Sequence, residues 1–125
     1  MIVDTSAMVA VLRRETEADR FIDRLLAASD VRISAGTLLE LRIVAERDGG
    51  SEELAELLET LGVEVVPVDA RQVDLAFDGF RRFGKGRHPA GLNFGDLFAY
   101  ALAQVLGEPL LFKGDDFART DIAAA

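Results

Sequence analysis

Short apolar runs alternate with longer amphipathic segments along the whole chain. The runs at 1–4, 31–35, 63–68 and 109–113 are short and rich in branched apolar side chains, which is typical of strands. Between these runs, apolar residues recur every three or four positions and indicate helices. Strands that alternate with helices predict an α/β fold with a mostly parallel sheet. Two helical segments between the second and third strands agree with helices on both faces of that sheet.

Polar residues and glycines mark the expected ends of the helices. Thr5 or Ser6 is predicted to cap the first helix, Ser51 a middle one and Asp69 a later one. The segment 85–95 holds three glycines and a proline and is predicted to be a loop. The alanines that close the sequence predict a frayed end.

Length and composition narrow the class of protein. The sequence has 125 residues, which fits one domain over 1–125. It has no cysteine, which excludes disulfides, thiolate zinc sites and cysteine nucleophiles. No apolar run approaches the length of a membrane span, and no signal segment opens the chain, so we expect a cytoplasmic protein with no membrane contact.

Acidic residues fall where parallel strands are expected to end. Asp4 ends the first strand, and Asp115 and Asp116 follow the last one. Asp96 begins the helix that leads into that last strand, and Glu40 lies near the start of another helix. Ligands of open α/β sheets bind outside the carboxyl ends of the strands, so these acids are predicted to share one rim.

Each of these acids also has a simpler explanation. Asp4 suits a helix cap, and Glu40 with Thr37 fits a capping box. Asp96 three residues after Asn93 suits a helix dipole, and an acid pair after a strand suits a turn. Caps and turns explain each acid singly more easily than they explain why all of these acids fall near the ends of strands.

Clustered carboxylates repel one another, and a hard divalent cation relieves that repulsion. Oxygen ligands favour Mg²⁺, with Mn²⁺ as an alternative, and such an ion can activate a water against a phosphate. Zinc is disfavoured because the chain has no cysteine and one histidine.

The formal net charge of −8 argues against a nucleic-acid-binding protein. The stretch 79–95, however, contains no acid and gathers positive charge. Its basic residues and the single histidine are the candidate RNA-binding residues: Arg81, Arg82, Lys85, Arg87 and His88. They could hold a phosphate backbone beside a metal-neutralised acidic site.

The segments MIVDTSAMVAVL, GLNFGDLFAYALA and PLLFKGDDFARTDI, with the Glu40 helix, together resemble the PIN-domain ribonucleases, and more closely the toxins of VapBC-type toxin–antitoxin pairs. The likeness covers essentially the whole chain. It implies a three-layer α/β/α sandwich and metal-dependent cleavage of structured RNA, with transfer RNA the commonest substrate class. It also implies a cognate antitoxin as partner and a homodimer.

The resemblance also assigns site residues. The family's first acid maps onto Asp4, its helix glutamate onto Glu40 and its third acid onto Asp96. Asp4 and Asp96 are expected to hold Mg²⁺, with Thr5 or Ser6 supporting the first acid from behind. The fourth acid is Asp115 or Asp116, and its place before Phe117 favours Asp116. Water would then displace the 3′ oxygen and leave a 5′ phosphate.

Two alternatives belong to other classes of protein. A receiver-like phospho-acceptor domain would use Asp69 as acceptor and Lys113 as its lysine, although the first strand lacks the adjacent acid pair expected there. A PIN-like binding module without catalysis would keep the fold and lose the chemistry. Cleavage of purified RNA separates this second alternative from a nuclease.

Overall fold

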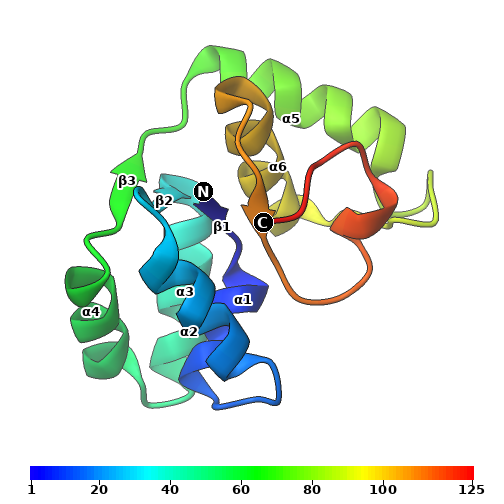
Figure 1. Cartoon of the computed structure of the whole chain (residues 1–125). Helices are drawn as coiled ribbons and strands as arrows, with labels where there is room; N and C mark the ends of the chain where they lie inside the picture. The colour runs from blue at the N-terminus through cyan, green and yellow to red at the C-terminus, as the bar shows by residue number, and fades with distance from the viewer.

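A four-stranded parallel sheet forms the centre of the computed structural model, which describes residues 1–125 (Figure 1). The strands are β1 (Ile2–Val3), β2 (Arg32–Ser34), β3 (Glu64–Val66) and β4 (Leu110–Leu111), in the order β3-β2-β1-β4. Every pairing is parallel, and Ile2 lies opposite Arg32 on one side and Leu110 on the other. The predicted α/β class and parallel sheet are therefore confirmed.

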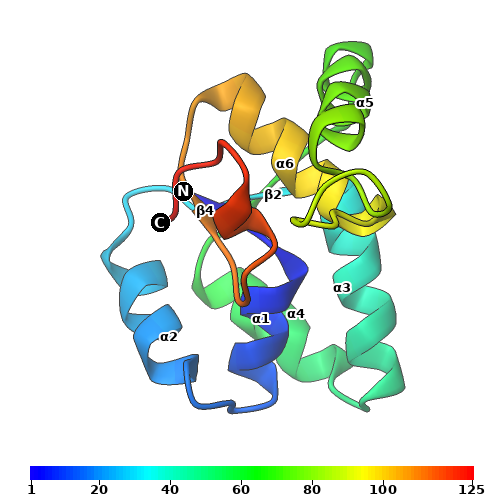
Figure 2. The same cartoon turned by 90° about the vertical axis from the view of Figure 1, so that its right-hand side faces the viewer.

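Six helices flank the sheet. They are α1 (Thr5–Leu12), α2 (Ala18–Ala27), α3 (Ala35–Arg47), α4 (Ser51–Thr60), α5 (Ala70–Phe83) and α6 (Phe94–Leu106), and a short 3₁₀ helix, η1, spans Phe117–Arg119. Figures 1 and 2 show α1 to α4 on one side of the sheet and α5 with α6 on the other. None of these helices is long and apolar enough to cross a membrane.

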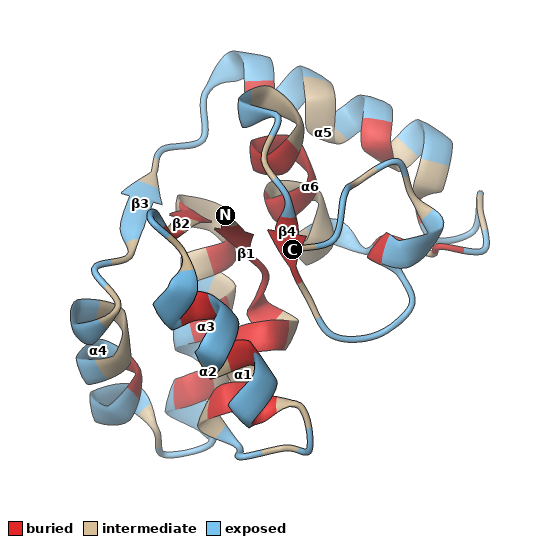
Figure 3. Ribbon diagram, in the orientation of Figure 1, coloured by how far each residue is buried: buried red, intermediate tan, exposed pale blue.

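Neighbouring strand residues supply the cores of the two sides, because successive side chains of a strand point to opposite faces. Ile2 and Leu110 pack in the apolar cluster that α6 completes. Val3 and Leu111 pack in the larger cluster beneath α1 to α4. All four are buried, and Figure 3 shows the buried residues concentrated around these strands.

The structure decides between the alternative caps of α1 and corrects those of α3 and α4. Asp4, which the sequence offered as a cap beside Thr5 or Ser6, caps α1, because its Oδ2 accepts the backbone N–H of Ser6 at 2.9 Å. Ser34 caps α3 and accepts the backbone N–H of Gly36. Gly50 precedes α4, so Ser51 is its first residue rather than its cap. The predicted cap of α5 is confirmed, since Asp69 accepts the backbone N–H of Gln72.

The C-terminal segment is tied to the body of the protein, so the expectation of a frayed end is wrong. The backbone N–H of Ala125 donates to the carbonyl of Leu110 at 2.9 Å, which extends the sheet beyond β4. Nearby, the Tyr100 hydroxyl donates to Asp121 at 3.0 Å, and Arg82 forms an ion pair with the same carboxylate at 3.1 Å. Burial and this hydrogen bond raise the pKa of Tyr100 to about 12.

Close packing of α5 on α6 depends on Gly79, because a Cβ at this position would lie 2.5 Å from the Tyr100 ring. We expect Gly79→Ala to lower the free energy of unfolding by about 1–3 kcal/mol, as overpacked cores do. Urea denaturation measures the change. Asp74→Ala on the exposed side of α5 is the control and should change it by less than about 0.5 kcal/mol. Equal stability of the two variants would contradict this account of the packing.

Candidate active site

Asp4 lies at the carboxyl end of β1 and begins α1. Its Oδ2 accepts hydrogen bonds from the backbone N–H and the hydroxyl of Ser6, at 2.9 and 2.6 Å. Its Oδ1 is buried and has no hydrogen-bond partner. Burial raises the pKa of Asp4 above its usual value, although the hydrogen bonds from Ser6 lower it. A buried carboxylate with one unsatisfied oxygen is costly and favours a cation beside it.

Ser6 connects Asp4 to the end of the neighbouring strand. Its hydroxyl donates to Asp4 and accepts the backbone N–H of Lys113, just after β4, at 3.0 Å. Thr5 makes a different and weaker contact, because its hydroxyl donates to the carbonyl of Thr37 at 3.5 Å. Of the two hydroxyls proposed to support the first acid, only that of Ser6 is bonded to it.

Glu40 lies on α3 and does not cap it. Thr37 is inside the helix rather than at its start, so the predicted capping box with Glu40 is wrong. The Glu40 carboxylate lies against Gly95 instead, where an added Cβ would meet Oε2 at 2.0 Å. Gly95 therefore keeps the space that the Glu40 carboxylate occupies.

Asp96 is the third residue of α6 and forms a capping box with Asn93. Its Oδ2 accepts the backbone N–H of Asn93 at 2.9 Å, and its own N–H donates to the Asn93 side chain at 3.0 Å. Partial burial raises the pKa of Asp96 to about 6, against the lowering effect of that hydrogen bond. The negative charges of nearby acids raise it further. These acids are Asp4, Asp116 and Glu40.

Asp115 and Asp116 are both exposed on the turn before η1. The charge of Asp116 is among the causes that raise the pKa of Asp96, so Asp116 lies near enough to act on that acid.

Asp4, Glu40 and Asp96 line one open cavity of about 680 Å³ between α3 and the start of α6. No three acidic or histidine side chains come close enough together to hold a metal ion as they stand. The donor chemistry nevertheless fits a hard cation: the ligands are carboxylate oxygens, one is unsatisfied, and their charges repel.

The predicted basic residues do not line this cavity. Arg82 is held by Asp121 and Asp78, and His88 Nδ1 accepts the backbone N–H of Ala90. Arg81 and Arg87 are exposed and lie over the rings of Phe77 and Phe80. Lys85 lines a separate apolar groove between α5 and α6.

Sequence reasoning missed two features of the cavity. Arg47 lines it from α3, seven residues after Glu40, a spacing that places both on one face of a helix. Asn93 lines it as well, and its pairing with Asp96 was readable as an N-x-x-D capping box. The sequence spacing of Arg47 from Glu40 and of Asn93 from Asp96 could have revealed both features.

The residues of the receiver-like alternative are engaged elsewhere. Asp69 caps α5 after the edge strand β3. The Lys113 ammonium forms ion pairs with Glu15 and Glu17. Neither residue lines the acidic cavity.

Comparison with known proteins identifies close relatives over the full length. A model of the family described as PIN domain matches residues 1–123. Ribonuclease VapC30 of Mycobacterium tuberculosis is 46% identical over 127 residues, which cover 98% of this chain and 96% of that protein. Ribonuclease VapC of Mycolicibacterium smegmatis is 48% identical over 128 residues, or 99% and 98% of the two chains.

Solved structures share the fold at lower sequence identity. A toxin–antitoxin complex from Klebsiella pneumoniae contains a chain with a TM-score of 0.77 and 16% identity, covering 99% of this chain and 95% of that one. The sarcin–ricin loop cleaving toxin VapC20 of Mycobacterium tuberculosis has a TM-score of 0.76 and 19% identity, with coverage of 99% and 97%. From the family match and the full-length relatives, the chain belongs to the PIN-domain VapC ribonucleases, the toxins of VapBC toxin–antitoxin pairs.

Proposed function

We propose that this ribonuclease toxin is a metal-dependent endonuclease that hydrolyses structured RNA, with transfer RNA as its substrate class. The observation that carries the proposal is the cavity in which Asp4, Glu40 and Asp96 meet, with the charge of Asp116 acting on Asp96. We propose the cytoplasm as its location, because its RNA substrate is found there.

The chain's own residues divide the work. Asp4 and Asp96 would hold Mg²⁺, or Mn²⁺ in its place, and Ser6 fixes the orientation of the Asp4 carboxylate. When bound, the ion lowers the pKa of a water and stabilises charge on the phosphate. Glu40, held over Gly95, orients the attacking water, and Asp116 completes the acidic wall. Water attacks the phosphorus, the 3′ oxygen leaves, and the downstream fragment keeps a 5′ phosphate.

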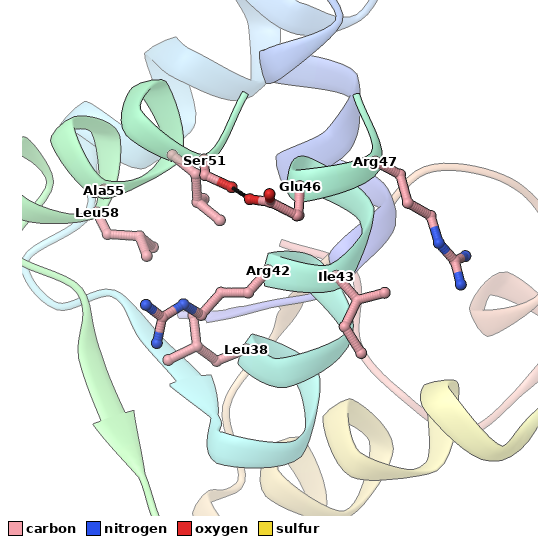
Figure 4. A pocket seen from close by; sticks show the side chains of 9 residues that line it. Leu38, Arg42, Ile43, Glu46, Arg47, Ser51, Ala55 and Leu58 are labelled. Atoms are coloured by element: carbon pink, nitrogen blue, oxygen red, sulfur yellow. Dashed lines mark hydrogen bonds between the residues drawn. The ribbon is translucent and has the colours of Figure 1, made fainter. Parts of the chain in front are cut away.

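A cognate antitoxin is the proposed protein partner. The structural neighbours include toxin–antitoxin complexes, and the acidic cavity would attract a partner's arginine in competition with metal. A groove of about 610 Å³ between α3 and α4 suits an amphipathic helix of that partner. Leu58 of α4 faces Leu38 of α3 across it, and Glu46 accepts a hydrogen bond from Ser51 at its end (Figure 4).

A homodimer is proposed through the other apolar face. The groove between α5 and α6 has a lining of thirteen residues, ten of them hydrophobic. Val73, Phe77 and Phe94 are more than half exposed there, at 55%, 57% and 78%. Large apolar side chains left open on one face are typical of a surface that another protein covers, and a second copy of the chain is the proposed occupant.

Cleavage of purified total RNA tests the proposed chemistry. We expect the partner-free protein to produce discrete fragments with Mg²⁺ and none with EDTA, and Asp96→Asn to lower the rate by at least about 100-fold, since a metal-holding carboxylate is lost. Asp115→Asn is the matched control and should keep cleavage within about threefold.

Unchanged cleavage by Asp96→Asn would overturn the assignment of this acid. Loss of cleavage in Asp115→Asn would instead reverse the choice between the two neighbours. Fragments that end in a 2′,3′-cyclic phosphate would exclude attack by water. A folded, metal-binding protein that cleaves no RNA would favour the binding module.

Asp96→Asn should also stabilise the metal-free protein. The pKa of the Asp96 carboxyl is about 6 in the folded protein and about 4 in the unfolded chain. The folded state thus holds more protons in this window, and wild-type stability falls as the pH rises through 6. Asparagine carries no charge, so it removes this pH-dependent loss. Allowing for solvent screening, the variant should raise the free energy of unfolding by about 1 kcal/mol at pH 8 and change it little at pH 4. Calorimetry of both proteins in EDTA measures the difference, and an equal gain at both pH values would contradict it.

Gly95→Ala should move the Glu40 carboxylate without disrupting the fold. The added methyl group would occupy the space of the Glu40 carboxylate and displace it, so we expect cleavage to fall by about tenfold or more while the far-UV spectrum stays unchanged. Gly50→Ala is the control, because the nearest atom to its Cβ is the Ala45 carbonyl at 3.8 Å. If both variants cleave RNA as the wild type does, Glu40 has no such role.

A further inference from the structure

Two arginines of α3 leave the helix on different sides, and neither forms an ion pair. Figure 4 shows Arg42 directed toward α4 and Arg47 directed to the opposite side with Ile43. Both side chains are exposed. They form a natural pair for comparison, since residue type, helix and exposure are the same.

Both arginines line the groove between α3 and α4, but only Arg47 also lines the cavity that contains the candidate catalytic acids. It lies seven residues beyond Glu40, nearly two helical turns, or about 10 Å along the axis. Ile43 lies between them and lines the same cavity. At this separation the Arg47 guanidinium and the Glu40 carboxylate cannot contact the same phosphate. An RNA strand that crosses the acids and follows α3 would still reach Arg47.

The other cation on the cavity wall is already engaged. Arg13 Nε and Nη2 donate to the two carboxylate oxygens of Asp48, at 2.7 and 3.3 Å. In the 79–95 region, Arg82 is held by Asp121 and no basic residue lines this cavity. Arg47 is therefore the unpaired positive charge at the candidate active site.

We propose that Arg47 binds a phosphate of the RNA adjacent to the one that is cleaved, so that the substrate runs along α3 rather than over the 79–95 region. This rests on the proposed ribonuclease site. A planar guanidinium can hold a phosphate with two parallel hydrogen bonds. In a protein of formal net charge −8, this contact would hold the polyanion near the acids. Arg47 is a positioning residue, because it lies away from the reacting atoms.

Binding without cleavage tests the contact directly. The probe is a fluorescein-labelled, mixed-sequence, single-stranded RNA of about 20 nucleotides, the length being set by the site sizes of single-strand binding proteins. Its anisotropy is followed in EDTA over a range of salt concentrations. We expect Arg47→Gln to weaken binding by about three- to tenfold at low salt and to reduce the salt slope by about 0.7, as loss of one phosphate contact requires. Arg42→Gln should leave both quantities unchanged.

Kinetics separate a substrate contact from a structural effect. On a cleaved RNA, Arg47→Gln should raise KM and leave kcat near the wild-type value, because it removes binding that is equal in ground and transition states. Arg47→Lys keeps the charge and should keep the salt slope. Equal binding by Arg47→Gln and Arg42→Gln, at matched melting temperature, would overturn the inference.

Failure of the inference and failure of the proposed function give different results. If Asp96→Asn abolishes cleavage while Arg47→Gln behaves as Arg42→Gln does, the active site stands and the RNA path along α3 is wrong. If Asp96→Asn cleaves normally, the proposed chemistry fails, and the anisotropy measurement still reports whether Arg47 contacts RNA.

Discussion

Burial of a carboxylate at the end of β1 is the constraint on which the rest of the site depends. Asp4 must cap α1, and it does so with one oxygen while the other remains without a partner. A fold that only needed a helix cap would gain more from a residue whose polar atoms are all satisfied. The unsatisfied oxygen of Asp4, the raised pKa of Asp96 and the nearby charge of Glu40 together concentrate uncompensated negative charge at the carboxyl end of β1.

Two of the acids are positioned by the hydrogen bonds that cap helices. Asp4 caps α1, and Asp96 belongs to the capping box of α6. Glu40 is free of such a role and is positioned instead by the missing side chain of Gly95. Two acids are therefore fixed by hydrogen bonds to the backbone at the starts of helices, whereas the position of the third depends on the close approach of α3 to Gly95.

Much of the architecture follows from the sequence, because the strand runs, helix periodicity and acids at strand ends are local signals. For α1 the sequence left Asp4, Thr5 and Ser6 as possible caps, and the structure selects Asp4. The caps of α3 and α4 were mispredicted, because Ser34 competes with Thr37 at the first start and Gly50 takes the cap position before Ser51 at the second. The apparent box of Thr37 and Glu40 failed for this reason. The ion pair of Arg82 with Asp121 could not be predicted either, because Asp121 is distant in sequence, whereas Asp78, four residues before Arg82 on α5, was a local signal that was not used.

That C-terminal segment gives the protein an optical property. The chain has one tyrosine, eight phenylalanines and no tryptophan, so its longest-wavelength ultraviolet absorbance and its tyrosine emission come from a single ring. The ring of Tyr100 is buried between α5 and α6, and its hydroxyl is bonded to Asp121. Spectroscopic signals from this residue consequently report the docking of the chain's end on α6.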